Sequence, residues 1–171
     1  MRIHFDTERL YFRNMTEADA GNVLRMNADP QVLQYIHERP LTDEADALQI
    51  LRDIIFPQYE IGLGRWAVIR KSDDAYLGWC GLKQRPELAS PDLGYRFFPA
   101  YWGQGYGLEA AQATLDHGFD KLSLPAISAA AHVDNIASNA ILRKIGMIYI
   151  QDDVIDGDPV HLYLAENPNN C

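Results

Sequence analysis

The stretch "YWGQGYGLEAAQATLDHGF", residues 101–119, decides the fold class of this chain. Three glycines, Gly103, Gly105 and Gly107, alternate with larger residues, and a helical apolar pattern begins directly after them. The first N–H groups of a helix have no partner inside the helix, and the helix dipole favours an anion there. Glycine lets a bulky anion approach this backbone because no Cβ intervenes. The stretch therefore predicts a phosphate-binding turn at residues 103–108, with a helix behind it that packs on a sheet.

Two other kinds of phosphate-binding turn are tested by the residues after the glycines. A P-loop needs lysine and then serine or threonine after its last glycine, but this chain has Leu108 and Glu109 there. A dinucleotide site needs the spacing GxGxxG and an acidic residue about 20 positions further on. The glycine spacing differs here, and residues 128–132 include no acid, so this site is disfavoured. A purely structural role, in which the glycines allow a tight turn or close packing, stays open.

The elements around this stretch predict one α/β domain over residues 1–171. Short strands joined by tight turns come first and a strand–helix–strand–helix unit comes after them, which is typical of a mixed sheet covered by helices. In such sheets a ligand binds where a strand feeds a helix. Strands are expected at residues 9–13, 64–71, 75–83, 91–98 and 126–133 and in a closing hairpin around 156–159. Helices are expected to begin at the capping residues Thr16, Asp29, Thr42 and Asn135.

Composition excludes several classes of protein. With 47% hydrophobic and 23% charged residues among 171, the chain has ordinary globular composition. The formal net charge is -9, so the chain lacks the basic surface that is typical of a nucleic-acid binder. An acidic surface slightly favours a cationic substrate. The N-terminus has no apolar signal segment and no apolar run could cross a bilayer, so we expect a cytoplasmic protein without a membrane partner. The two cysteines, Cys80 and Cys171, lack paired metal-type spacing, so no metal site is expected.

A second motif, "VDNIASNAILRKIGM", occupies residues 133–147. By itself it is typical of a well-capped helix, with Asn135 as the N-cap and Gly146 at the end. Its position one strand after the glycine turn gives it more weight, because two motifs in this order are more specific than either alone.

In that order, the motifs resemble those of the GNAT superfamily of N-acetyltransferases, and most of all its RimJ/RimL-type branch, known for acetylating the N-termini of ribosomal proteins. The resemblance covers nearly the whole chain. It is carried by "TERLYFRNMTEADA", "DPQVLQYI", "DLGYRFFPAYWGQGYGLEA" and "NIASNAILRKIGM". Several motifs in the right order are more specific than any one of them.

The resemblance implies a fold and a cosubstrate. The fold is a mixed, mostly antiparallel sheet with helices on both faces and a central splayed parallel pair, here residues 93–98 and 126–133. Acetyl-CoA is the acyl donor, with its pantetheine between these strands and its pyrophosphate on the glycine turn. The implied cofactor-binding residues are Phe97, Phe98, Gly103, Gln104, Gly105, Tyr106, Gly107, Leu108, Asn135 and Ser138. The chain departs from the family pattern at Trp102, where Gln or Arg is usual, and at Leu108, where many relatives carry Thr, so shifted phosphate contacts are expected.

The resemblance also implies direct attack of a primary amine on the thioester in a ternary complex. Asp92 matches an acidic position that assists the base, and Ser138 is placed to donate a proton to the leaving thiolate. A backbone N–H near Phe97 or Phe98 would polarise the thioester carbonyl. A solvated acid at a strand edge and an ordinary first-turn serine explain Asp92 and Ser138 equally well. Of the other candidates, Tyr149 and Tyr163 are expected to pack in the closing strands, and His132 and Cys80 to be structural.

Three matters stay open from the sequence. A non-catalytic acyl-CoA-binding or sensing domain would keep the glycine turn without the chemistry, and an interaction protein would use the glycines for packing alone. The acceptor amine, whose pocket is expected from residues 15–56 and the closing hairpin, could be a protein N-terminus, a free amino acid, a polyamine or an antibiotic. The chain could be a monomer or a homodimer.

Overall fold

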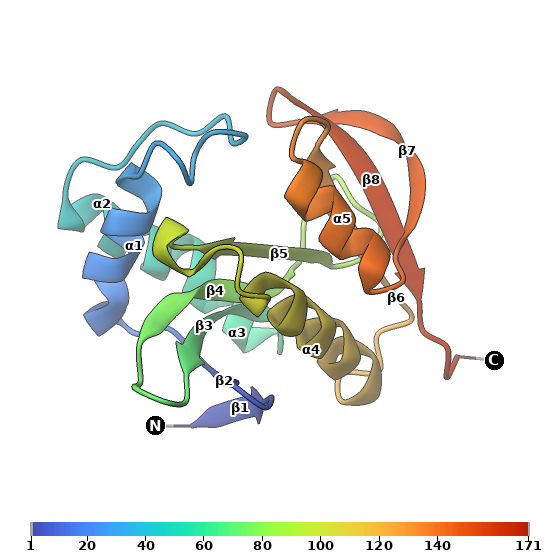
Figure 1. The fold of residues 1–171 in the computed structure, drawn as a ribbon, viewed down its shortest axis with the longest axis horizontal. Helices are drawn as coiled ribbons and strands as arrows, with labels where there is room; N and C mark the ends of the chain where they lie inside the picture. Colours follow the sequence, from blue (N-terminus) through green and yellow to red (C-terminus); the bar gives the residue numbers. More distant parts are fainter. Residues whose placement is uncertain (1, 171) are drawn as a thin grey trace.

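The computed structural model describes residues 2–170, so Cys171 lies outside the described residues, and it contains one eight-stranded sheet (Figure 1). The strand order is β1-β2-β3-β4-β5-β6-β8-β7, and only β5 and β6 run parallel. The bounds are β1 (Ile3–Asp6), β2 (Leu10–Arg13), β3 (Gly64–Arg70), β4 (Tyr76–Lys83), β5 (Asp92–Phe97), β6 (Ala126–His132), β7 (Ile148–Ile155) and β8 (Asp158–Glu166). The prediction of a mixed, mostly antiparallel sheet is confirmed.

Helices cover both faces of the sheet. They are α1 (Ala20–Ala28), α2 (Glu44–Ile50), α3 (Phe56–Glu60), α4 (Tyr106–Asp120) and α5 (Ile136–Lys144). A π-helical turn, Leu51–Ile55, joins α2 to α3. Figure 1 shows α4 and α5 together over the middle of the sheet, whereas α1 and α2 lie at one side of it. Within residues 2–170, no helix has the length and apolar character needed to cross a membrane.

Alternation along the strands divides the core into two clusters. Trp66, Cys80 and Leu82 face α4, whose Ala111 and Leu115 complete the larger cluster. The intervening strand residues, Ala67, Ile69 and Trp79, face the other way and pack on α1 and α2. Each large apolar side chain buried in this way stabilises the fold by roughly 1.5–3 kcal/mol. The two faces of the sheet are therefore fixed by packing, which in turn fixes the side on which each polar residue emerges.

The parallel pair is splayed. β5 and β6 are paired only at Asp92 and Ser128, where the Ser128 N–H donates to the Pro91 carbonyl at 2.9 Å. The Ser128 hydroxyl also contacts that of Ser90 at 2.5 Å. Beyond this point β5 keeps its pairing with β4 and β6 keeps its pairing with β8, but the two strands no longer bond to each other. The central splayed pair expected from the sequence is confirmed.

Two sequence predictions near the N-terminal third were wrong. Residues 29–36 form turns instead of a helix, and the Leu33 N–H bonds to the Asp29 carbonyl. A single helical turn is unfavourable because it orders several backbone dihedral angles for only one hydrogen bond. The chain then continues without regular secondary structure as far as residue 43. The N-cap of α2 is Asp43 instead of Thr42, since the Asp43 carboxylate accepts from the Asp46 N–H at 2.9 Å.

Candidate active site

The three glycines serve two different purposes. Gly103 and Gly105 have φ values of +72° and +81°, a left-handed conformation that strains other residues. Gly105 is the N-cap of α4. Gly107 lies inside the helix, where an added Cβ would come within 3.2 Å of Ile141 Cδ1 on α5. The turn therefore needs the first two glycines for its shape and the third for close packing of α4 and α5.

The amides of this turn are free to bind an anion. Among the described residues, the N–H groups of residues 103–108 donate to no acceptor, and the first paired amide is Glu109 N–H, 3.1 Å from the Gly105 carbonyl. An added Cβ at Gly103 would meet no atom within 4 Å, so the turn is open at that point. A fifteen-residue helix, α4, directs its dipole at these amides. The turn fits a pyrophosphate group.

The side chains of the turn hold it in place. The Trp102 indole N–H donates to the Phe97 carbonyl at 2.8 Å, and the Gln104 amide donates to the Ala100 carbonyl at 3.2 Å. Tyr106 is buried and Leu108 packs against the larger core cluster. These four side chains are occupied within the protein, so the turn presents mainly its backbone to a ligand.

Arg9 is a residue of this site that the sequence reasoning missed. Its Nη1 donates to the Gln104 carbonyl at 3.0 Å, and its Nε lies 3.3 Å from Glu109 Oε1. Its guanidinium carbon also lies 4.3 Å above the Tyr106 ring. Arg9 thus ties the turn to the start of β2 and brings a positive charge beside it. Since 95 residues separate Arg9 from Gln104, no local pattern indicates this contact.

The end of β5 offers one free amide toward the opening. The Phe98 N–H donates to the Leu77 carbonyl at 3.0 Å, so it is engaged with β4. Successive backbone groups of a strand point to opposite sides, and the Phe97 N–H is therefore directed toward β6. Of the two amides considered for the thioester carbonyl, only that of Phe97 faces the gap.

The start of α5 faces β5 across the same gap. Asn135 caps the helix, its Oδ1 accepting from the Ser138 N–H at 3.1 Å. The Ser138 hydroxyl lies 2.8 Å from the Tyr95 hydroxyl. Tyr95 was not singled out from the sequence, although strand alternation from Leu93 and Phe97 places it on the α5 side. The pair orients Ser138, and burial raises the pKa of Tyr95 to about 12, so its hydroxyl keeps its proton.

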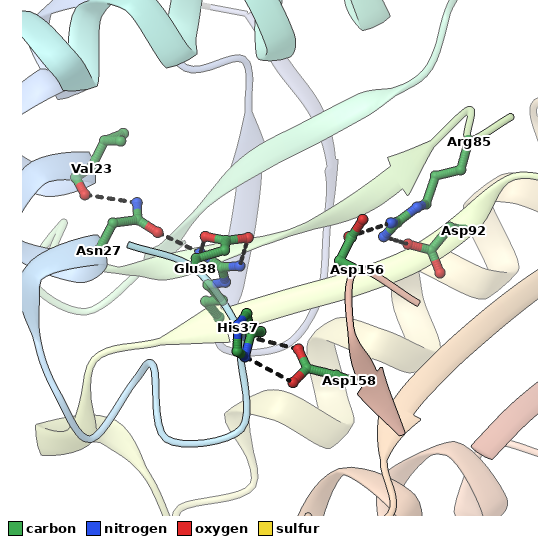
Figure 2. Close-up of polar contacts among 9 residues, drawn as sticks. Val23, Asn27, His37, Glu38, Arg85, Asp92, Asp156 and Asp158 are labelled. Atoms are coloured by element: carbon green, nitrogen blue, oxygen red, sulfur yellow. Dashed lines mark hydrogen bonds and ion pairs between the residues drawn. The ribbon is translucent and has the colours of Figure 1, made fainter. Parts of the chain in front are cut away.

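Asp92 begins β5 and is buried, with 6% of its surface exposed. Its interpretation as a solvated acid at a strand edge is therefore wrong. Burial raises the pKa of Asp92 to about 6, and the charges of Arg65, Arg85 and Lys83 oppose this rise. Arg85 Nη1 lies 3.7 Å from Asp92 Oδ2 (Figure 2). The carboxylate is thus ionised at neutral pH but accepts a proton more readily than an exposed aspartate.

Both predicted catalytic side chains line one cavity of about 200 Å³, called here the β5–β6 pocket. Its lining includes Asp92, Tyr95, Asn135 and Ser138. Of the predicted cofactor-binding residues, Asn135 and Ser138 line it, whereas Phe97, Phe98 and the turn residues 103–108 do not.

Two segments distant in sequence close the pocket. Glu38, from the chain between α1 and α2, bonds to Arg96 Nη2 at 2.8 Å. The neighbouring His37 N–H donates to Asp158 Oδ2, on the β7–β8 hairpin, at 2.7 Å. Figure 2 shows His37 and Asp158 facing each other across this junction. A pocket wall from the α1–α2 region and the closing hairpin is what the sequence led us to expect.

Other titratable candidates have structural surroundings. Cys80 is buried 3.2 Å from the Thr114 hydroxyl, and burial raises the pKa of its thiol to about 12. Tyr163 donates to Asn139 Oδ1 at 2.5 Å inside the core. His132 lines the pocket, but its Nδ1 accepts from the Asp134 N–H at 3.1 Å. Over residues 2–170, no three His, Cys, Asp or Glu side chains are grouped to hold a metal ion.

Comparison with known proteins assigns the family. The model of the acetyltransferase (GNAT) domain matches residues 9–148. An uncharacterized N-acetyltransferase p20 of Bacillus licheniformis is 31% identical over 140 residues, covering 81% of this chain and 79% of that protein. The chain therefore belongs to the GNAT acetyltransferase family. Its class is the acyl-CoA-dependent N-acetyltransferases, which transfer an acetyl group to an amine, and a non-catalytic acyl-CoA-binding role is not favoured.

Two solved structures share the fold. A ribosomal-protein α-N-acetyltransferase, RimL, in complex with coenzyme A has a TM-score of 0.82 at 18% identity, covering 96% of this chain and 98% of that one. The spermidine N-acetyltransferase of Vibrio cholerae, in complex with coenzyme A and spermine, has a TM-score of 0.81 at 17% identity, covering 96% and 99%. These two enzymes are named for different acceptors, so the shared fold leaves the acceptor of this chain open.

Proposed function

We propose that this enzyme transfers the acetyl group of acetyl-CoA directly to a primary amine, with both substrates bound at once. The observation that carries the proposal is the splay of β5 and β6 beyond the Asp92–Ser128 bridge. It leaves the edge of β5 unpaired, and residues 92–96 of that strand line the pocket that holds Asp92 and Ser138. Donor and acceptor then meet in the opening from its two ends.

The donor is held mainly by backbone. The free amides of residues 103–108 would bind the pyrophosphate at the positive end of α4, with Arg9 adding its charge. The unpaired edge of β5 would bond to the pantetheine amides, and Asn135 would bond to them from the α5 side. The Phe97 N–H would polarise the thioester carbonyl. Acetyl-CoA supplies the activated acetyl group, and all further steps depend on the side chains of the pocket.

The acceptor loses two protons during the reaction. Asp92 takes the first, directly or through one water, and converts the ammonium into a nucleophilic amine. The nitrogen then bonds to the carbonyl carbon while the carbon–sulfur bond breaks, so no covalent enzyme intermediate forms. Ser138, held by Tyr95, donates a proton to the departing thiolate and regains one from the acylated nitrogen or from water. The products are an amide and free coenzyme A, and Asp92 returns its proton to solvent.

A thermal melt with and without acetyl-CoA tests the donor assignment. At a ligand concentration about 100-fold above the dissociation constant, linkage gives roughly 2.7 kcal/mol of stabilisation. Release of thiol on adding a set of amines then tests transfer. A melting temperature that acetyl-CoA leaves unchanged would remove the donor assignment and reduce the glycines to a packing role.

A further inference from the structure

Arg65 reaches the β5–β6 pocket across two glycines. It belongs to β3, and its register neighbours on the next two strands are Gly81 of β4 and Gly94 of β5. An added Cβ at Gly94 would lie 4.0 Å from Arg65 Nη2, so the side chain extends across the sheet to β5. Its guanidinium carbon lies 4.3 Å from the centre of the Trp79 ring, a cation–π contact that stabilises this position of the side chain. The guanidinium is thus brought to the strand that borders the opening.

The other two arginines of the pocket are neutralised by protein carboxylates. Arg96 pairs with Glu38 at 2.8 Å, and Arg85 pairs with Asp156 at 2.8 Å (Figure 2). The Arg65 guanidinium makes no hydrogen bond or ion pair with any residue in the 2–170 range, although it lines the same pocket. Burial lowers its pKa to about 10, which still leaves it charged at neutral pH. A guanidinium on a pocket wall without a bonded partner is stabilised when a bound molecule supplies an anionic group.

This cation lies next to the base of the proposed reaction. Asp92 precedes Gly94 by two positions on β5, so both point to the same face of the sheet. Both side chains line the β5–β6 pocket, and the charge of Arg65 opposes the rise in the pKa of Asp92. The pocket therefore presents a cation together with a proton-accepting carboxylate. They complement a molecule that carries an ammonium group and a carboxylate a few bonds apart.

We propose that the acceptor is a small amine with a carboxylate close to its amino group, as in a free amino acid, and that Arg65 binds this carboxylate. The inference rests on the acetyl transfer proposed above and identifies its substrate class. Arginine suits the role because its planar fork can bond to both oxygens of a carboxylate. The carboxylate stays unchanged while the acetyl group moves from sulfur to nitrogen.

The pocket disfavours the other acceptors. The pocket of about 200 Å³ must also admit the thioester end of the donor, which leaves room beside Arg65 for a molecule of amino-acid size. That volume is below the roughly 300–1,000 Å³ of sites for drug-sized ligands. A polyamine would bring a second cation toward Arg65, and like charges repel. A peptide N-terminus has a neutral amide where the carboxylate would lie, which would leave Arg65 without an anionic partner.

The test compares the twenty amino acids with their primary amides, using thiol release at saturating acetyl-CoA. We expect at least one amino acid to exceed its own amide in kcat/KM by about tenfold or more. An amino amide is less protonated at neutral pH than the parent amino acid, so amine reactivity alone would favour the amide. A preference for the carboxylate therefore reports on the pocket.

Variants connect this preference to Arg65. We expect Arg65→Gln to bring kcat/KM for the amino acid down to that for its amide, read as the ratio of the two substrates in the same protein so that any change at Asp92 affects both alike, and Arg65→Lys to restore part of the difference. Arg52→Gln removes an arginine that pairs with Glu17 on the exposed surface, and it should leave the ratio unchanged. A thermal melt with acetyl-CoA shows for each variant that the protein is folded and binds the donor.

Three results would overturn the inference. Turnover of the amides or of spermidine by the wild type as fast as of any amino acid would remove the carboxylate requirement. An equal fall for amino acid and amide in Arg65→Gln would make Arg65 merely structural. Wild type that shifts its melting temperature with acetyl-CoA but acetylates no amino acid would also exclude this substrate class. In all three cases the assignment of acetyl-CoA as the donor stands. Its failure would be seen separately, as a melting temperature that acetyl-CoA leaves unchanged.

Discussion

The glycine turn and the β5–β6 pocket meet at one opening but are built in opposite ways. The turn is a continuous piece of backbone, residues 103–108, supported by the dipole of α4. The pocket is an assembly of charged side chains from β3, from β5, from the chain after α1 and from the closing hairpin. If the turn binds the donor and the pocket binds the acceptor, as proposed, the difference teaches that the acceptor end can change its side chains while the donor end, made mainly of backbone, stays the same.

The sharpest test of this separation is Asp92→Asn. The variant keeps the size of the side chain and its place beside Arg85 but removes the base, so we expect kcat to fall by about 10²–10⁴-fold. The shift of melting temperature caused by acetyl-CoA should remain as in the wild type. If Asp92→Asn also abolished that shift, the two ends would not be separate.

The complementary change is Gly105→Ala, with Gly62→Ala as its matched control. Both glycines have nearly the same backbone conformation, φ +81° and φ +79°, so both substitutions cost about 1–2 kcal/mol of stability. Only the Cβ at Gly105 would stand against a bound pyrophosphate, and we expect acetyl-CoA affinity to fall by about tenfold or more there alone. Calorimetric titration of both variants with acetyl-CoA measures this affinity. Equal acetyl-CoA affinities in the two variants would mean that Gly105 has a role in the fold alone.

The pH dependence of kcat and of acetyl-CoA binding distinguishes the pocket from the glycine turn without any mutation. Because burial raises the pKa of Asp92 to about 6, kcat should fall as the pH drops through 6, by about tenfold per unit below it. Acetyl-CoA binding at the backbone turn should not follow that curve. The free energy of unfolding changes with pH in the opposite direction to kcat. Because the folded protein favours protonated Asp92, stability falls as Asp92 ionises between pH 4 and 6. Asp92→Asn should therefore gain stability relative to wild type over that range, as denaturant titrations at several pH values would show.

The smallest effect is expected at the junction of the two ends. Asn135→Ala and Asp43→Ala each remove a helix N-cap and should each lower stability by about 1 kcal/mol. Asn135 also lines the pocket, so its variant alone should weaken acetyl-CoA binding, by a few-fold. Chemical denaturation and acetyl-CoA titration of the pair distinguish a capping role from a contact with the donor; an unchanged affinity in Asn135→Ala would leave capping as its role.

The two ends also differ in how far the sequence predicts them. The glycine turn, the capped α5 and the splayed strands are each indicated by contiguous motifs, so they could be located before the structure. Arg9 and Arg65 could not, because their contacts depend on strand register and on residues far along the chain. The burial of Asp92 was equally hidden, since it depends on how segments far apart in the sequence come together around the β5–β6 pocket. The irregular course of residues 36–43 shows the same limit, as it contacts β5 and β8, which come much later in the sequence.

The single bridge between Asp92 and Ser128 has a consequence for how the protein holds together. The sheet consists of two smaller sheets, β1–β5 and β6–β8, that share one point of backbone contact. A donor lying in the gap would supply hydrogen bonds that neither strand can find in the other. Acetyl-CoA would then act as a missing strand and couple the unfolding of the two parts. Amide hydrogen exchange should detect this as slower, more uniform exchange in β5 and β6 once the donor is bound.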